Sequence, residues 1–310
     1  MRILYVANEW DYGDRAGGAR SYEHYNFYES LVALGHEVIY FDYQQMSSQF
    51  GQDAMNAALE SHVDALQPDL LFACFMYDEV SRALMRRISD RLPTLLWLCD
   101  DHWRWESFSC QWAPQFRWVV TTASDAPAKY EAMGYHGAIK SQWGAGPGYE
   151  RLDLPLLYDV TFVGRAHGDR WRYLQPLRDA GVNVRVWGPE HGEGRLTQEE
   201  MVRVFNQSRI NLNFSESAQP GYRQIKGRHF EIPACGGFQL TNLPDDNFLE
   251  YFTADEVGVF RDPIDLVDQV EWWLAHPTER AKVAAAGHLR VMRDHTYARR
   301  FGDIFARMGL

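Results

Sequence analysis

Short apolar runs alternate with segments of helical periodicity along the first half of the chain. Runs such as Ile3–Ala7, Asp69–Cys74 and Thr94–Leu98 predict buried strands, because they are mostly apolar and only five or six residues long. The segments between them, for example 54–66 and 80–90, space their apolar residues three or four positions apart and predict helices. Strands that alternate with helices in this way indicate a parallel, doubly wound α/β sheet.

A segment rich in glycine and proline, Gly144–Pro155, interrupts this pattern and predicts a linker between two domains. The alternation of strands and helices starts again with the strand Val160–Gly164 and continues to the end of the chain. We therefore expect two Rossmann-like domains, over 1–150 and 156–310, that face a central cleft.

The composition excludes several broad classes of protein. With 11 Trp, 16 Tyr and 17 Phe among 310 residues, the chain has too many large aromatic side chains for a disordered protein. Its first residues lack the features of a signal peptide, and no run approaches the roughly 18 apolar residues of a membrane span. The four cysteines are widely spaced, with no CxxC pair, which favours reduced, buried thiols over a metal site. These features predict a cytoplasmic protein.

The formal net charge of −11 is unevenly distributed. Residues 1–155 carry 12 basic and 21 acidic side chains, whereas residues 161–231 carry 11 basic and 8 acidic ones. The first half is thus a poor surface for a phosphate backbone, and its acidity favours a largely uncharged acceptor. The second half suits a small anionic ligand.

Residues 209–242 hold the strongest candidate site. An apolar strand ends in polar residues, and a loop with Arg223, Lys226 and Arg228 leads into a helix that contains Glu231. Ligands of open α/β sheets bind beyond the carboxyl ends of strands, and a cationic loop at the start of a helix suits a diphosphate. A glutamate there can accept hydrogen bonds from ribose hydroxyls. A solvated basic loop whose glutamate complements the helix dipole fits the same residues, and the residues alone leave both interpretations open.

Within this stretch, HFEIPACGGFQLTN resembles the nucleotide-sugar segment of two-domain GT-B glycosyltransferases. The string QIKGRHFEIPACGGF is similar to the bacterial spore-maturation-protein (CgeB-like) glycosyltransferase family, and so are RSYEHYNFYESLVALGHEV, LCDDHWRWESF and HPTERAKVAAAGHLRVMRDHTYARR. The resemblance covers most of the chain, and 226–237 is its most specific part. It implies a GT-B fold with an acceptor-side first domain and a donor-binding second domain, whose last helix, 297–309, crosses back to the first.

The resemblance also implies roles for individual residues. Glu231 would hold the donor ribose, and Lys226 and Arg228 would neutralise the donor diphosphate. Gly164 would let the backbone approach the ligand, and Arg165 would add a phosphate contact. The complete expected donor site consists of Gly164, Arg165, Glu216, Tyr222, Arg223, Lys226, Arg228, Glu231 and Gly236.

The chain departs from the broad family pattern at one position. That pattern pairs the ribose glutamate with another acid eight residues earlier, and here that position is Arg223. Glu216 is the nearest stand-in. The departure leaves open whether the reaction retains or inverts the anomeric configuration.

Two segments of the first domain could act on an acceptor. Asp100, Asp101 and His102 follow a predicted strand, where a carboxylate or imidazole could deprotonate an acceptor hydroxyl. A helix cap at Asp100 and a solvated Asp101 explain the same residues. An Asp-Asp pair can also hold a metal ion, but the basic donor loop makes one unnecessary, so we expect none.

The second segment is the glycine-rich turn 13–24, which lacks the spacing of a dinucleotide-binding loop or a P-loop. By resemblance, Gly17 and Gly18 would permit close approach to the reacting groups, with Arg20 and His24 beside them. A plain strand-to-helix turn fits equally well.

We therefore predict a glycosyltransferase that uses a nucleotide sugar, by default a UDP-sugar, and no other cofactor. The acceptor stays open among a protein, a glycan, a metabolite and a modified DNA base. A non-catalytic nucleotide-sugar-binding protein or inactive partner subunit is the main alternative, and the missing paired glutamate favours it. An epimerase or a phosphorylase on a related fold is a further alternative.

Overall fold

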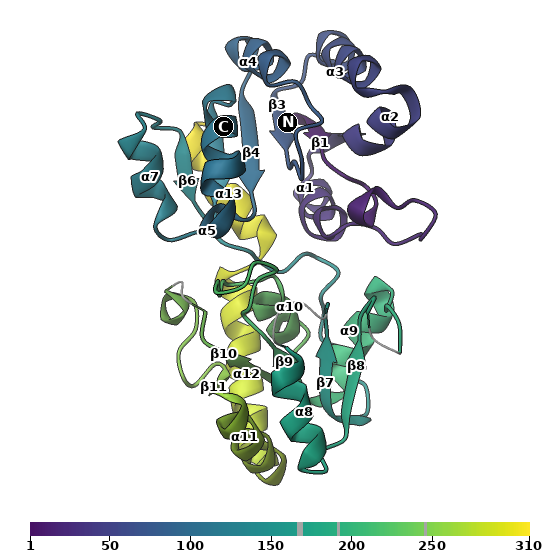
Figure 1. Cartoon of the computed structure of the whole chain (residues 1–310), viewed down its shortest axis with the longest axis vertical. Helices are drawn as coiled ribbons and strands as arrows, with labels where there is room; N and C mark the ends of the chain where they lie inside the picture. The colour runs from purple at the N-terminus through teal and green to yellow at the C-terminus, as the bar shows by residue number, and fades with distance from the viewer. Residues whose placement is uncertain (166–169, 191–192, 245–246) are drawn as a thin grey trace. The chain divides into compact units, whose positions relative to one another are not determined.

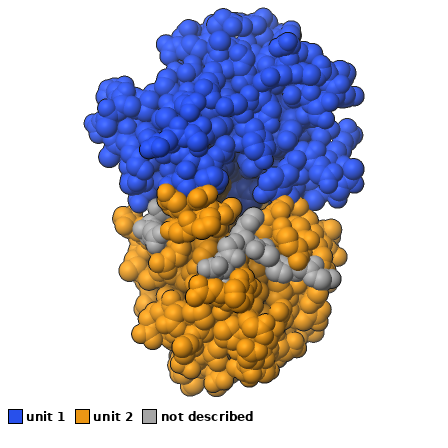
Figure 2. Space-filling model, in the orientation of Figure 1, with its two compact units in different colours: residues 1–142, 297–310 blue, residues 143–296 orange. Residues whose placement is uncertain are grey.

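The computed structural model describes the whole chain except residues 166–169, 191–192 and 245–246. The chain forms two compact units (Figure 2). Unit 1 comprises residues 1–142 and 297–310, and unit 2 comprises residues 143–296. The glycine- and proline-rich segment 144–155 thus lies within unit 2.

Unit 1 contains a parallel sheet with the strand order β2-β1-β3-β4-β5-β6 (Figure 1). Its strands are β1 (Arg2–Val6), β2 (Glu37–Phe41), β3 (Leu70–Ala73), β4 (Thr94–Leu98), β5 (Trp118–Thr121) and β6 (Ala138–Lys140). The chain leaves β1 toward β2 on one side and later returns to β3 on the other. The order therefore reverses between β1 and β3, which is where open α/β sheets bind ligands.

Helices cover both faces of this sheet. They are α1 (Glu29–Ala33), α2 (Tyr43–Phe50), α3 (Gln52–Leu66), α4 (Arg82–Arg91), α5 (Asp101–Arg104), α6 (Cys110–Trp112), α7 (Ala126–Ala132) and α13 (Tyr297–Met308), with π-helical turns at His24–Tyr28 and Trp105–Ser109 and 3-10 turns at Asp11–Gly13 and Ala113–Gln115. Successive strand residues point to opposite faces. Leu71 packs with α3 and α4, whereas Phe72 stacks edge-on against Phe301 of α13 at 5.6 Å. The last helix thus belongs to the core of unit 1.

Two local boundaries differ from the sequence prediction, and capping explains both. The apolar run 37–43 predicts a strand over its full length, but β2 ends at Phe41 because the Asp42 carboxylate accepts hydrogen bonds from the backbone N–H groups of Gln44 and Gln45 and so caps α2. The pattern after the glycine pair Gly17-Gly18 predicts a helix from there to Leu34, but the helical segment starts only after Ser21, whose hydroxyl accepts from the backbone N–H of His24 at 3.0 Å.

Unit 2 contains a second parallel sheet with the order β11-β10-β9-β7-β8. Its strands are β7 (Tyr158–Val163), β8 (Val184–Trp187), β9 (Ser208–Asn213), β10 (Gln239–Asn242) and β11 (Gly258–Phe260). Its helices are α8 (Trp171–Asp179), α9 (Gln198–Gln207), α10 (Arg228–Ala234), α11 (Pro263–Ala275) and α12 (Pro277–Asp294), with a 3-10 turn at Phe248–Glu250. The order of strands reverses between β7 and β9.

The predicted α/β fold with two doubly wound, parallel sheets is confirmed. Phe162, Leu212 and Leu240 from adjacent strands form the core of unit 2 with side chains of α8 and α11. Among the described residues, none of the helices combines the length and apolar character that crossing a bilayer requires.

Candidate functional site

The candidate site in unit 2 lies where β7 and β9 end. Gly164 and Arg165 follow β7, and Phe214, Ser215 and Glu216 follow β9. These strands are parallel neighbours on either side of the reversal in strand order. The loops that follow them are therefore where a ligand of this sheet is expected.

Arg170 joins these two loops. Its guanidinium group donates to the backbone oxygen of Arg165 at 2.5 Å and to that of Glu216 at 3.1 Å. The residue is only 6% exposed, and its Nε atom has no hydrogen-bond partner among the described residues. A buried donor without a partner is costly.

Lys226 and Arg228 bring two more cations to the same place. The Lys226 ammonium donates to the Glu216 backbone oxygen, the same acceptor that Arg170 uses. Arg228, the first residue of α10, reaches the Val163 oxygen at the end of β7 at 3.5 Å. Three cationic side chains thus converge on the carboxyl ends of β7 and β9.

The charges of these residues influence one another. Burial lowers the pKa of Arg170 to about 10; Glu216 opposes this shift, and the neighbouring Arg228 guanidinium adds to it. Arg170 still carries its charge at neutral pH. Two guanidinium groups close enough to repel each other make a local positive potential that a diphosphate would relieve.

Glu216 supports the site mainly through its backbone. Its carboxylate Oε1 accepts hydrogen bonds from the Tyr173 hydroxyl at 2.8 Å and from the Asn242 amide at 2.7 Å. Burial, together with the bonded Glu216, raises the pKa of Tyr173 to about 12. The Oε2 atom is buried and has no partner in the part of the chain that the structure describes. This carboxylate is therefore anchored at one oxygen only.

Glu231, the expected ribose ligand, is completely buried. Its Oε1 accepts from the Tyr149 hydroxyl at 2.8 Å, and its Oε2 forms an ion pair with Arg228. Arg228 itself remains 28% exposed at its side chain. In this conformation Glu231 holds Arg228 in place, and Arg228 is the member of the pair that solvent and ligand can reach.

His229 ties the loop before α10 to the strand ends. Its Nδ1 accepts from the backbone N–H of Lys226 at 2.9 Å, so its Nε2 carries the proton and faces the hydroxyls of Thr241 at 3.3 Å and Ser215 at 3.5 Å. The imidazole is fully buried. It fixes the distance between the Lys226 loop and the end of β9.

The remaining predicted donor residues lie further out. Arg165 forms an ion pair with Glu190 at 3.0 Å. Tyr222 and Arg223 are exposed in a narrow loop, in which the backbones of Glu216 and Arg223 pair as an isolated antiparallel bridge. A Cβ on Gly164 would lie 2.9 Å from the Phe162 ring, so the packing against Phe162 also requires a glycine there.

Gly236 does not join the cationic group. It ends α10 with a φ of +73°, where a side chain is strained. It lines a cavity of about 580 Å³ with Ser208 and Phe238, which lie at the amino ends of β9 and β10. This cavity is therefore at the opposite edge of the sheet from Arg228, and Gly236 has the role of a helix terminator.

In unit 1, Asp101 lies in the core. It is completely buried and accepts a hydrogen bond from the Tyr130 hydroxyl at 2.8 Å. Burial raises the pKa of its carboxyl group. A base must contact the proton that it removes, so in this conformation Asp101 cannot serve an acceptor and acts as a structural partner of Tyr130.

Asp100 and His102 flank Asp101 and are half-buried beyond the end of β4. Of the glycine-rich turn, Gly17 and Gly18 are exposed, and Gly18 has a φ of +71°. Arg20 forms an ion pair with Glu9 and lies 4.0 Å from the centre of the Trp10 ring.

His24 stacks on Tyr28 at 5.1 Å, and burial lowers its pKa to about 4. These contacts fit a structured turn and leave the acceptor roles of Arg20 and His24 as predictions.

Several residues near the sites were not predicted from the sequence. In unit 2 these are Tyr149, Arg170, Tyr173, His229 and Asn242. Arg170 lies within a segment that the sequence singled out, but nothing in the spacing distinguishes it from a surface arginine. In unit 1 the structure places Glu23 beside Cys74 and Cys99.

Comparisons with known proteins find similarity in sequence and in fold. A family model described as glycosyl transferase-like matches residues 167–306. The chain is 21% identical to the spore protein CgeB of Bacillus subtilis (strain 168) over 265 residues, which are 76% of this chain and 81% of that protein.

Solved structures show the same fold. Sucrose-phosphate synthase from Thermosynechococcus elongatus superposes with a TM-score of 0.68 and 12% identity over 99% of both chains. Anabaena HepE in complex with UDP-glucose superposes with a TM-score of 0.66 and 12% identity over 100% of this chain and 99% of that chain. The chain is therefore similar in sequence to the spore protein CgeB and, over residues 167–306, to the glycosyl transferase-like family, and it has the GT-B fold.

Proposed function

We propose that this chain transfers a sugar from a nucleotide-sugar donor, by default a UDP-sugar, to a hydroxyl group of an acceptor. The observation that carries the proposal is the convergence of Arg170, Lys226 and Arg228 on the carboxyl ends of β7 and β9. The anomeric C–O bond to the diphosphate breaks in such a transfer, and negative charge develops on the departing phosphate. Cations already held in place stabilise that charge without reorganisation.

The proposal also assigns roles to the acceptor, to a base and to Glu231. The acceptor oxygen forms the new bond to the anomeric carbon, and its proton passes to a base in an inverting reaction or to the departing phosphate in a retaining one. Asp100 and His102, which are half-buried beyond β4, are the proposed acceptor-side groups. Because Glu231 is completely buried, the ribose contact proposed for it requires a movement that exposes its carboxylate.

Calorimetric titration with UDP and with a panel of nucleotide sugars tests the donor site. Each of the variants Arg170→Met and Lys226→Met should bind UDP ~10–100-fold more weakly, because a hydrogen bond to a charged group contributes ~1.5–3 kcal/mol. Arg178→Met is the matched control, since Arg178 is an exposed cation on α8. If no nucleotide or nucleotide sugar binds the wild-type chain, the proposed function is wrong.

A non-catalytic nucleotide-sugar-binding role is the second candidate. The burial of Glu231 and its ion pair with Arg228 favour it, because the carboxylate that was expected to hold the ribose is not accessible to a ligand in this conformation. Release of UDP from UDP-sugars in the presence of a broad acceptor panel distinguishes the two. Tight binding without release in every acceptor mixture supports the binding protein, and release above the hydrolysis rate supports the transferase.

A further inference from the structure

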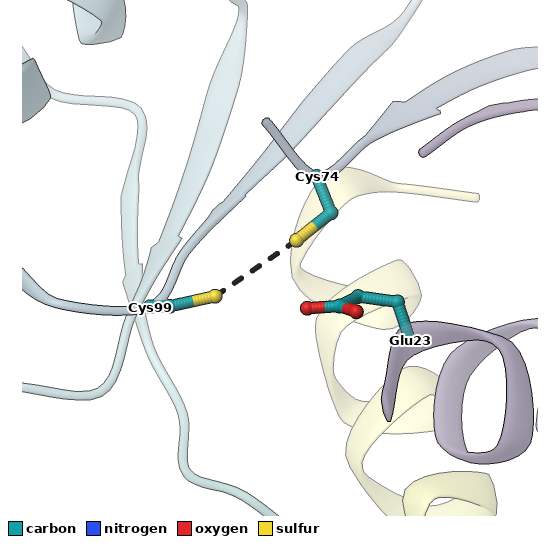
Figure 3. A group of neighbouring side chains, drawn as sticks. All are labelled: Glu23, Cys74 and Cys99. Carbon is teal, nitrogen blue, oxygen red and sulfur yellow. Dashed lines mark hydrogen bonds between the residues drawn. The ribbon is translucent and has the colours of Figure 1, made fainter. Parts of the chain in front are cut away.

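We propose that Glu23, Cys74 and Cys99 of unit 1 form a binding site for a thiophilic divalent cation, with Zn²⁺ as the best match. One carboxylate oxygen and the two sulfur atoms all lie within 4.8 Å of one another (Figure 3). The inference does not depend on the proposed sugar transfer, because none of these three residues has a role in that proposal.

The fold explains why these three residues meet. Cys74 directly follows β3 and Cys99 directly follows β4, and these strands are parallel neighbours. Their first residues beyond the sheet therefore lie at the same edge. Glu23 comes from the helical segment after the glycine-rich turn, and its carboxylate points toward both sulfur atoms (Figure 3).

The spacing of the two sulfur atoms fits a tetrahedral metal ion. The Sγ atoms of Cys74 and Cys99 are 3.8 Å apart. Two thiolates bound at ~2.3 Å with a tetrahedral angle between them lie about 3.8 Å apart. A disulfide needs a separation of about 2.05 Å, so the observed distance suits a shared ion without movement of either strand.

The charges around the group also favour a cation. No lysine or arginine forms an ion pair with Glu23 in the portion of the chain that is described. The carboxylates of Asp11 and Asp100 add further negative charge close to Glu23. The negative charges of Glu23, Asp11 and Asp100 would attract a divalent cation.

The number and exposure of the ligands indicate an open site. Cys74 is 2% exposed, whereas Glu23 and Cys99 are half-buried, so an ion can enter from the side of those two residues. Two thiolates and one carboxylate leave the fourth tetrahedral position for water or another ligand. Zn²⁺ accepts this mixture of sulfur and oxygen ligands, whereas Mg²⁺ and Ca²⁺ prefer oxygen alone.

Metal titration of the reduced, metal-free chain tests the site. We expect one equivalent of Zn²⁺ to bind, and Co²⁺ in its place to show the absorption of thiolate-to-cobalt charge transfer. The variants Cys74→Ser, Cys99→Ser and Glu23→Gln should each lose at least ~10–100-fold in affinity, the loss that follows removal of even an outer-shell partner. Cys110→Ser is the matched control, because Cys110 is half-buried on α6 and outside the group.

A second measurement on the wild-type chain does not depend on any variant. Zn²⁺ should slow the alkylation of Cys99 strongly and leave that of Cys110 unchanged, as read by mass spectrometry of peptides. Three results would overturn the proposal: no stoichiometric binding, equal binding by Cys74→Ser and wild type, or alkylation of Cys99 that ignores Zn²⁺. Formation of a Cys74–Cys99 disulfide in air with no Zn²⁺ binding after reduction would also overturn it.

Discussion

The ion pair between Arg228 and Glu231 offers a sharp test of how the candidate site is built. Glu231 is completely buried, with Arg228 on one oxygen and Tyr149 on the other. Replacing Arg228 by Met keeps an unbranched apolar side chain beside the Phe205 ring but removes the positive charge. The buried carboxylate then loses this cation and keeps the neutral hydrogen bond from Tyr149.

The expected cost follows from burial. Removing one partner of a buried ion pair costs ~3–5 kcal/mol. Since the Arg228 side chain is 28% exposed, water can partly replace it, and we expect ~2–3 kcal/mol. For a unit of about 150 residues, each kcal/mol lowers the melting temperature by ~2–4 °C. The unfolding midpoint of unit 2 should therefore fall by about 4–12 °C.

The double variant Arg228→Met/Glu231→Gln separates this explanation from a general loss of packing. Glutamine carries no charge that would be left buried without a partner, and its side-chain oxygen can still accept a hydrogen bond from Tyr149. The double variant should therefore recover most of the lost stability. Thermal and urea denaturation followed by circular dichroism compare wild type, Arg228→Met, Glu231→Gln and the double variant, with Arg178→Met as the control. If Arg228→Met unfolds at the wild-type midpoint, or if the two losses simply add, the buried pair does not work as described.

Three further predictions follow from other contacts. Tyr149→Phe removes the second partner of Glu231 and should lower the free energy of unfolding by ~1.5–3 kcal/mol; an unchanged urea midpoint would contradict it. Gly236→Ala should cost ~1–2 kcal/mol because its φ is +73°, yet leave the calorimetric affinity for UDP unchanged, since Gly236 lies at the other edge of the sheet. The hydrogen bonds of Arg261 hold the pKa of Asp265 below its usual value. The charged Asp265 carboxylate therefore stabilises the fold above that usual value, and this contribution is lost as the pH falls through the folded pKa. Asp265→Asn should have a lower urea midpoint than wild type at neutral pH, and the two midpoints should converge in acid.

The periodicity of the chain predicted both sheets, because strands buried on both faces are apolar throughout and stand out in any sequence. Boundaries were less predictable where a side chain competes with the strand for the backbone. Asp42 is such a case, since the apolar run that ends at Phe41 does not indicate that the Asp42 carboxylate caps the next helix.

The candidate site was predictable only in part. The stretch that contains Lys226, Arg228 and Glu231 was found because charged residues next to an apolar strand are conspicuous. Arg170 was not found, because its importance depends on two carbonyl oxygens from different loops, those of Arg165, 5 residues before it, and Glu216, 46 residues after it. The burial of Asp101 was also not predictable, since a polar residue after a strand is expected to be exposed unless its buried partner, here Tyr130, is known.

The cysteines show the same limit. Cys74 and Cys99 are 25 positions apart and match no metal-binding spacing, so the sequence favoured isolated thiols. Only the pairing of β3 with β4 brings them together.

The most direct test of the central claim is the affinity for UDP after two positive charges are removed at the site. Arg170→Met/Lys226→Met should bind UDP ~100-fold or more weakly than wild type, since each charged hydrogen bond contributes ~1.5–3 kcal/mol. The control Arg178→Met/Lys282→Met removes two exposed charges from the same unit and should bind within about twofold of wild type, because exposed charges are screened. Equal losses of UDP affinity in the two double variants would show that the affinity depends only on the total charge of the protein. That result would contradict a donor site at the ends of β7 and β9.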